Sequence, residues 1–265
     1  MIIDVHAHVF PDKLAEKASV NIGHFYGLNM KYNGTVESLL KEGTAAGVDK
    51  FVIHSVATSP KQVDSINHFI HDTYMNNKDI FIGFCSLHPD SEKLEEEFDW
   101  AMENGLKGIK LHPDFQKFYI DDDKAMRIYE LAEGVCPIIM HMGDYRTEYS
   151  KSDRLVKVLD KFPNLDVIAA HFGGFSEWDT AAATLSLAKS RVYVDTSSST
   201  FRLAPNQIRE LIDIYGADRV LFGTDYPMWG AQGELDYFKN VEITDDEWDM
   251  ISHKNFENLM LKYEK

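Results

Sequence analysis

The chain has 265 residues, 44% of them hydrophobic, and a formal net charge of −16 at pH 7. That apolar content is enough for a substantial folded core. The acidic balance argues against nucleic-acid and anionic-membrane partners, because both need a basic surface. It does not exclude an anionic substrate, since a bound cation reverses the local field. The two cysteines, Cys85 and Cys136, are expected to be reduced core thiols.

The N-terminus begins with a strand-like run and lacks a basic, signal-like segment. No window approaches the roughly 18 consecutive apolar residues that a membrane-spanning helix requires. We therefore expect a cytoplasmic protein.

Eight short apolar runs rich in Val, Ile and Phe recur along the chain. Their length and composition are typical of strands buried on both faces of a parallel sheet. The predicted strands are residues 2–6, 50–56, 80–87, 108–111, 138–141, 167–171, 192–195 and 220–223.

The segments between these runs carry helix signals. Thr35 is a cap-like residue and Gly47 ends the segment that it opens, while Pro60 lies in the first turn of the next segment. Acidic residues gather at the beginning of several later segments, which suits the helix dipole. The predicted helices are 35–47, a helix from 59 onward, 90–102, 121–132, 152–162, 176–189, 205–215 and 244–261.

Eight βα units in one run predict an α/β fold, a closed (β/α)8 TIM barrel, as one domain over residues 1–265. The alternative is a doubly wound open sheet, but no glycine-rich dinucleotide loop follows any strand. Residues 10–33 read as a long connection that would lie over the barrel mouth.

The first predicted strand carries two histidines at its carboxyl end. Because strand side chains alternate, His6 and His8 share one face with Asp4, whereas Ile3 and Val5 share the face that suits packing against helices. We expect His6 and His8 to point inward, spaced to hold one ion between two imidazoles.

Other ligand-type residues stand where further strands stop. His141 ends the fifth strand, His171 ends the sixth, and Asp225 follows the eighth. Barrel active sites form at the carboxyl ends of the strands. The sequence therefore predicts a divalent-metal site with chemistry attached.

Taken together, the motifs Asp-x-His-x-His, Lys-Leu-His-Pro, His-x-Gly, His-x-Gly-Gly and Gly-Thr-Asp-Tyr-Pro resemble the amidohydrolase superfamily. The resemblance covers essentially the whole chain. It is to the amidohydrolase-related (amidohydrolase-2) branch, which includes aminocarboxymuconate-semialdehyde decarboxylase and related metal-dependent hydrolases. It implies that His6, His8, His141 and Asp225 bind one divalent ion, zinc first and manganese as the alternative. It also implies that His171 stands near the metal-bound water or the scissile group.

These implied roles agree with the chemistry of the residues. Asp225 can both touch the ion and accept a proton from water, and His171 can stabilise an oxyanion or protonate a leaving group. We therefore expect Asp225 and His171 to be catalytic.

Lys110 and His112 share a face at the end of the fourth strand. For Lys110 three interpretations stay open: an ammonium that binds a substrate carboxylate, a carbamylated bridge between two metals, as some superfamily members use, or a salt bridge inside the barrel. His112 is a candidate for substrate binding, and His54 on the second strand is a weaker candidate for functional contact.

Three further candidates for substrate binding follow strands. Arg146 and Arg202 lie after the fifth and seventh strands and can clamp a carboxylate with two parallel hydrogen bonds. Solvated loop arginines are the competing interpretation. Trp229 follows Asp225 and can form a wall of the pocket.

The first functional prediction is a metal-dependent hydrolase that attacks a small amide, ester or lactone with metal-activated water. The second is a non-oxidative decarboxylase (carboxy-lyase) of a small carboxylic acid at the same site. The third is a catalytically silent barrel that binds only a metal or ligand. The expected partner is a small, carboxylate-bearing substrate, and the resemblance suggests a homodimer.

Overall fold

The computed structural model describes residues 1–188 and 192–264. Its strands are short, and every pairing between neighbouring strands is parallel. The strands are β1 (Ile3–His8), β2 (Lys50–His54), β3 (Phe81–Gly83), β4 (Cys85–Ser86), β5 (Ile109–Leu111), β6 (Ile138–Met140), β7 (Val167–Ala169), β8 (Val192–Asp195) and β9 (Val220–Leu221).

The predicted third strand, 80–87, changes partner in its middle. The Phe84 N–H donates to the Ile53 carbonyl on β2 (2.9 Å), whereas the next N–H, of Cys85, donates to the Gly108 carbonyl beside β5 (2.8 Å). The set β1-β2-β3 is therefore continuous with the set β4-β5-β6-β7-β8-β9.

The other side of the ring closes between β1 and the segment that follows β9. The Val5 N–H donates to the Phe222 carbonyl (2.9 Å) and the His8 N–H donates to the Tyr226 carbonyl (2.7 Å). These bonds complete the (β/α)8 TIM barrel that the order of elements predicts.

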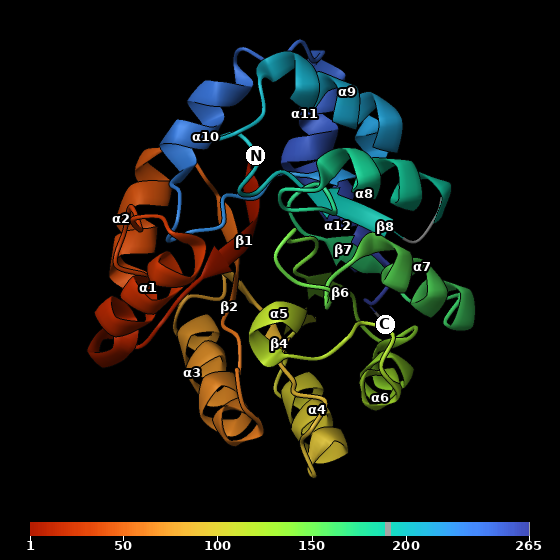
Figure 1. The fold of residues 1–265 in the computed structure, drawn as a ribbon. Coiled ribbons are helices and arrows are strands. Elements are labelled where there is room, and N and C mark those ends of the chain that lie inside the picture. The colour runs from red at the N-terminus through yellow and green to blue at the C-terminus, as the bar shows by residue number, and fades with distance from the viewer. Residues whose placement is uncertain (189–191, 265) are drawn as a thin grey trace.

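Helices cover the outside of the strands, as Figure 1 shows. Within the described residues no helix combines the length and apolar character needed to cross a bilayer. The helices are α1 (Asp12–Tyr26), α2 (Val36–Ala45), η1 (Pro60–Gln62), α3 (Val63–Asn76), α4 (Leu94–Glu103), α5 (Pro113–Gln116), α6 (Asp123–Ala132), α7 (Ser152–Lys161), α8 (Trp178–Leu185), η2 (Ser186–Ala188), α9 (Pro205–Tyr215), η3 (Ala217–Arg219), α10 (Ala231–Phe238), α11 (Asp245–Asp249), η4 (Met250–Lys254) and α12 (Asn255–Leu261).

Residues 10–33 border the barrel mouth as predicted, but the prediction of a loop was wrong, because α1 occupies most of this segment. The residues that α1 buries are small: Ala15, Ser19 and Gly23, spaced four apart. A Cβ on Gly23 would come within 2.6 Å of the Leu28 carbonyl oxygen, so close approach requires glycine. These small buried residues have helical spacing but contribute little hydrophobic signal of their own.

Two other helix predictions need adjustment. Helix α10 lies in a region where the sequence analysis placed none. The predicted helix 176–189 is α8 continued by η2, and residue 189 lies outside the described residues.

Strand β1 also departs from simple alternation. Its pairing with β2 shifts between Asp4 and Ala7, where β1 carries one extra residue. Ile3 and Val5 consequently pack inside the barrel with residues of other strands, such as Ile139, and do not face the helices as predicted. A bulge re-aims side chains in this way, and it leaves His6 and His8 at the mouth.

Candidate active site

Six polar side chains from five places in the sequence meet at the carboxyl ends of the strands. Most are buried, and His8 and Asp225 retain a little exposure. They are His6 and His8 from β1, Lys110 from β5, His141 after β6, His171 after β7 and Asp225 after β9.

The tightest group forms around His6. Its Nε2 lies 3.3 Å from His8 Nε2 and 3.5 Å from Asp225 Oδ1, and His8 Nε2 is also 3.5 Å from that oxygen. Asp195 Oδ2 lies 2.8 Å from His6 Nδ1. A proton on Nδ1 would donate to this carboxylate and leave the Nε2 lone pair facing the group. Two imidazoles and one carboxylate are donors that zinc and manganese accept.

The protonation of the histidines also suits a metal ion. Burial, followed by the charge of Lys110, lowers the pKa of His6, His8 and His141 well below the ordinary value. Neutral imidazole is the form that binds metal. Among the described residues, His141 Nε2 and both ring nitrogens of His54 are buried without a hydrogen-bond partner. Such orphaned atoms suit a ligand or ion at this position.

The fourth predicted ligand, His141, faces a neighbouring group. Its Nδ1 lies 2.9 Å from His171 Nε2, and its Nε2 lies 3.4 Å from Asp114 Oδ2. His171 stands between the two groups, with its ring centroid 5.2 Å from that of His6. In the described chain, ligand atoms within 4.8 Å of one another form the trios His6/His8/His54, His6/His171/Asp195 and His112/Asp114/His141. The role of His141 beside Asp225 stays a prediction.

Asp195 is a site residue that the sequence analysis missed. Its Oδ2 orients His6, and its Oδ1 accepts the backbone N–H of His171 (3.0 Å). A carboxylate behind a ligating histidine fixes the ring orientation and raises its basicity. The signal was available, because Asp195 is the last residue of a correctly predicted strand.

Four non-glycine residues in or beside the polar cluster have positive φ angles, in the left-handed region: His171 (φ 61°), Phe172 (φ 49°), Ser198 (φ 46°) and Asp225 (φ 63°). Such strain costs of order 1–3 kcal/mol per residue and clusters at functional sites. Backbone hydrogen bonds hold the strained turns, including one from the Asp225 N–H to the His6 carbonyl (2.9 Å).

Lys110 is buried with its Nζ 2.8 Å from His6 Nε2. Burial lowers the pKa of its amine to about 8, although the charges of Asp225 and Asp195 act in the opposite direction. The group nearest to this amine is the His6 imidazole and not a carboxylate, so this contact is not a salt bridge. An ion at His6 Nε2 would replace it.

His112 lies against the same group and is joined to α1. Its ring stacks on His141 (3.9 Å) and on Phe115 (3.8 Å). His112 Nδ1 accepts the Phe115 N–H, so in the neutral ring Nε2 carries the proton and donates to the Tyr26 hydroxyl oxygen 3.0 Å away. The Tyr26 O–H can then donate to a ligand, which makes Tyr26 a second residue that the sequence analysis missed.

The two predicted carboxylate clamps are placed elsewhere. Arg146 donates through Nε and Nη2 to Asp144 and through Nη1 to the Phe25 carbonyl (2.5 Å). Arg202 is exposed and lies over the Phe201 ring. Among the described residues, neither arginine lines the cavity described below.

Trp229 does not line that cavity either. Its Nε1–H donates to Ser198 Oγ (2.9 Å), and that hydroxyl donates to Asp225 Oδ2 (2.5 Å). Trp229 therefore orients Asp225 through Ser198, and the structure does not support its predicted place in the pocket wall.

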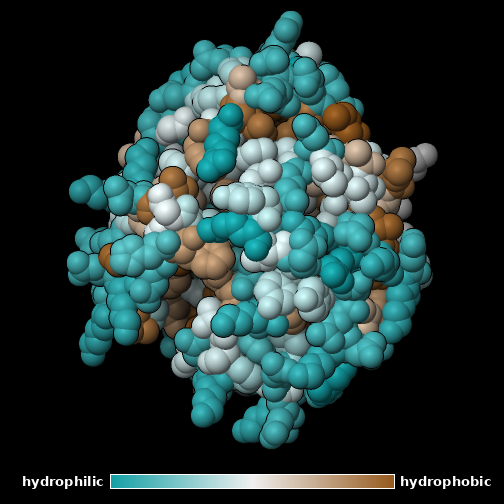
Figure 2. All heavy atoms as spheres, viewed as in Figure 1, coloured by the Kyte–Doolittle hydropathy of each residue, from teal (hydrophilic) through white to brown (hydrophobic). Residues whose placement is uncertain are grey.

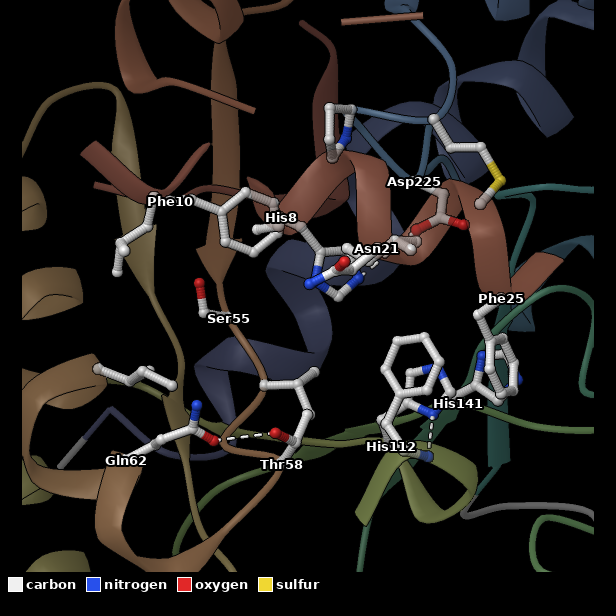
Figure 3. A pocket seen from close by; sticks show the side chains of 18 of the residues that line it. His8, Phe10, Asn21, Phe25, Ser55, Thr58, Gln62, His112, His141 and Asp225 are labelled. Carbon is white, nitrogen blue, oxygen red and sulfur yellow. Dashed lines mark hydrogen bonds and ion pairs between the residues drawn. The ribbon is translucent and has the colours of Figure 1, made fainter. Parts of the chain in front are cut away.

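A cavity of about 690 Å³ opens onto the polar cluster. His8, His112, His141, His171 and Asp225 line one part of it. Figure 3 shows Asp225 and His8 pointing into this space.

Over part of its length the chain is similar in sequence to a known decarboxylase. A stretch of 117 residues is 30% identical to gamma-resorcylate decarboxylase of Polaromonas sp. (strain JS666), and it spans 38% of this chain but only 36% of that protein.

The fold matches solved structures over nearly the full length. An uncharacterized TIM-barrel protein from Bordetella bronchiseptica superposes with a TM-score of 0.82 at 19% identity, covering 99% of each chain. A dihydroxybenzoic acid decarboxylase from Polaromonas sp. JS666, solved with manganese and the inhibitor 2-nitroresorcinol, gives 0.74 at 16% identity, covering 100% of this chain and 98% of that one.

The family model described as Amidohydrolase, of the amidohydrolase-2 type, matches residues 3–257. With the barrel and its histidine and aspartate cluster, the chain belongs to this amidohydrolase family.

Proposed function

We propose that the protein is a metal-dependent, non-oxidative decarboxylase of a small aromatic carboxylic acid. The observation that carries the proposal is the cavity, largely lined by apolar side chains, which ends directly on the imidazole and carboxylate cluster. A carboxylate bound there loses its hydration shell, and desolvation favours a transition state in which charge is dispersed as CO2 departs. This reverses the order of preference drawn from the sequence, where hydrolysis came first.

The decarboxylase relatives support that change, since one shares 30% identity over its matched stretch and another was solved with manganese. We propose one divalent ion, zinc or manganese, held by His6, His8 and Asp225, with His141 as the further ligand. When bound, the ion supplies positive charge that orients the carboxylate and an adjacent substrate oxygen. Lys110 is proposed to act as a free, non-carbamylated amine beside His6.

Decarboxylation breaks the bond between the ring and the carboxylate, leaves the electron pair on the ring carbon, and needs a proton there. Asp225 is proposed to deliver it. Asp225 lines the cavity beside His6 and His8, so its carboxyl can carry a proton between solvent and the ring carbon. His171 and the Tyr26 hydroxyl are proposed to hold the substrate oxygens.

Hydrolysis of an ester, amide or lactone remains the alternative, because Asp225 lies beside both His6 and His8 and can equally accept a proton from water. The deciding experiment uses metal-loaded protein in D2O with 2-hydroxybenzoates and 2,6-dihydroxybenzoates. Headspace CO2 is measured together with deuterium at the vacated ring carbon.

A parallel panel of esters and lactones is followed by acid release. CO2 with deuterated arene supports the decarboxylase, and acid release without CO2 moves the assignment to a hydrolase. Tight metal binding with neither reaction would leave the silent barrel. The Asp225→Asn variant serves as the control for adventitious turnover.

A further inference from the structure

The cavity continues well beyond the polar cluster, between α1 and the region of β2, η1 and α3. Figure 3 shows Thr58 and Gln62 on one side of this space and His112 and His141 on the other. On the molecular surface, Figure 2 shows a hollow with apolar side chains left of centre, where Figure 1 has the gap between α1 and α3.

One face of α1 lines this extension. Leu14, Ala18, Ile22 and Phe25 all border the cavity, and their spacing places them on one stripe of the helix. The stripe covers about 16 Å along the helix axis. It is separate from the stripe of small residues that packs on the barrel. Leu14 remains 56% exposed and Phe25 38% exposed, so these apolar side chains have no protein partner that covers them fully.

The facing wall comes from α3 and the turn before it. Gln62, Ser65, Ile66 and Phe69 line the cavity at spacings of three and four residues, again one helical face. The apolar members of the two stripes therefore bound the same space from opposite sides.

Charge is sparse in this extension. Apart from Asp225 and from Asp114, which lies beside His141, Lys117 is the charged residue in the described lining, and it is exposed. The other polar lining residues are uncharged: Asn21, Ser55, Thr58, Gln62 and Ser65. A second buried carboxylate would need a cation beside it. The lining stripes of α1 and α3 supply none, and Arg146 is bound to Asp144, so a dicarboxylate fits poorly between these two helices.

The cavity is also larger than one aromatic ring requires. An apolar cavity of roughly 150 Å³ accommodates benzene, whereas this cavity has about 690 Å³. A simple benzoate at the polar cluster would leave most of the apolar wall in contact with water.

We propose that the substrate is a monocarboxylic acid whose ring carries an uncharged apolar extension, alkyl or aryl, seated between α1 and α3. The proposal relies on the proposed function for the position of the carboxylate. Its test therefore measures binding separately from turnover.

The probes are 2-nitrophenol and its 4-alkyl and 5-alkyl derivatives with ethyl, butyl and hexyl chains. The nitro group takes the place of the carboxylate and cannot leave as CO2. Calorimetry on the manganese-loaded protein should show affinity rising up to about fourfold per added methylene in at least one series, until the cavity is filled. Equal affinity for short and long chains, or no binding of any member, overturns the proposal.

Two variants locate the extension. Ala18→Trp fills the space from α1, and Ile66→Asp places a charge on the α3 wall. Each should reduce the hexyl-to-unsubstituted affinity ratio toward one. Val20→Trp is the matched control, because Val20 is exposed on α1 and does not line the cavity. A ratio that survives in Ala18→Trp and Ile66→Asp would place the chain elsewhere and contradict the proposal.

The matching 2-hydroxybenzoates are then assayed for CO2. If the long nitrophenols bind with the expected chain dependence but no acid releases CO2, the proposed decarboxylase fails while the apolar subsite stands. If CO2 is released but chain length has no effect on binding, the apolar subsite fails while the proposed decarboxylase stands.

Discussion

At the scale of single residues, the site depends on the carboxylate of Asp195, which does not line the described cavity. Asp195 is buried, contacts His6 and the His171 backbone, and accepts hydrogen bonds from Ser197 as well. It thereby joins the metal-facing part of the site to the strained turn at His171. Its loss should affect metal affinity before it affects the fold.

Asp195→Asn should weaken manganese or zinc binding about 10- to 100-fold, because the amide no longer fixes His6 with its Nδ1 protonated. Metal titration by calorimetry measures this. Asp166→Asn is the matched control: Asp166 is also buried but pairs with Lys262 at the opposite end of the barrel. Unchanged affinity in Asp195→Asn would show that Asp195 does not orient a ligand.

Asp225→Asn should retain part of the metal but lose turnover by about 100-fold or more, because the amide cannot carry the reacting proton. Metal content and CO2 release are measured on the same preparation. Trp229→Phe should cost only a few-fold, since it removes one hydrogen bond to Ser198 and leaves the carboxyl in place. Near-normal turnover of Asp225→Asn would remove Asp225 from the mechanism.

Glu234 makes stability depend on pH. It is buried on α10, accepts a hydrogen bond from Thr200, and burial raises its pKa from 4.5 to about 8. Between about pH 4.5 and pH 8, the Glu234 carboxyl is therefore protonated in the folded state but ionised in the unfolded state. The contribution of Glu234 is therefore fully present below pH 4.5 and is lost as the pH rises toward 8.

The loss amounts to at most about 5 kcal/mol. Glu234→Gln should flatten the decline of the unfolding free energy between pH 5 and pH 8, measured by urea denaturation. The exposed Glu210→Gln serves as the control. An identical slope in wild type and Glu234→Gln would mean that the buried carboxyl is ionised in the folded protein.

At the scale of elements, α1 is an additional helix between β1 and α2 that borders the cavity at the mouth. Its C-terminal end is held by Arg146, whose guanidinium lies 4.5 Å from the Phe25 ring centre and donates to the Phe25 carbonyl. Arg146 is itself fixed by Asp144. The arginine thus fastens the helix over the cavity and supports Tyr26 beside His112.

Arg146→Ala should loosen this end of α1, raise KM several-fold and change kcat little, because the metal cluster is untouched. Hydrogen exchange over residues 20–28 should increase. Arg154→Ala is a matched control, since Arg154 also pairs with an aspartate and stacks on an aromatic ring, Tyr119, without lining the cavity. A large fall in kcat with unchanged exchange would indicate direct contact with substrate.

At the scale of the whole molecule, a metal would join the beginning and the end of the barrel, which meet at its closure. His6 and His8 come from β1 and Asp225 from the segment after β9, the two sides of the closure. Binding energy at the cluster would therefore add directly to the stability of the closed ring.

Chelation should lower the melting temperature, and metal at 100 times its Kd should restore about 2.7 kcal/mol of stability. Elemental analysis of protein purified without chelator or affinity nickel should give about one ion per chain, the stoichiometry of a single three- to four-ligand site. Two ions per chain would instead point to the His112/Asp114/His141 trio or to a carbamylated Lys110. No binding after reconstitution would contradict the proposed mechanism.

Much of this architecture could be predicted because parallel strands leave a clear local signal. Residues 192–195 form a strand as predicted. The run 2–6 becomes the longer β1, Ile3–His8, and the other apolar runs become strands with shorter bounds. Helix α1 was missed, because the stripe that it packs on the barrel is built of small residues, and its apolar stripe from Leu14 to Phe25 lines the cavity instead.

What the sequence determines by itself is the order of βα units and the ligand-type residues at the strand ends, since both arise from local patterns. Tertiary structure alone decides which of those residues meet. A bulge turns β1 so that His6 and His8 reach Asp225, and Asp144 draws Arg146 away from the cavity. These outcomes depend on contacts between residues far apart in the chain, which no local pattern encodes.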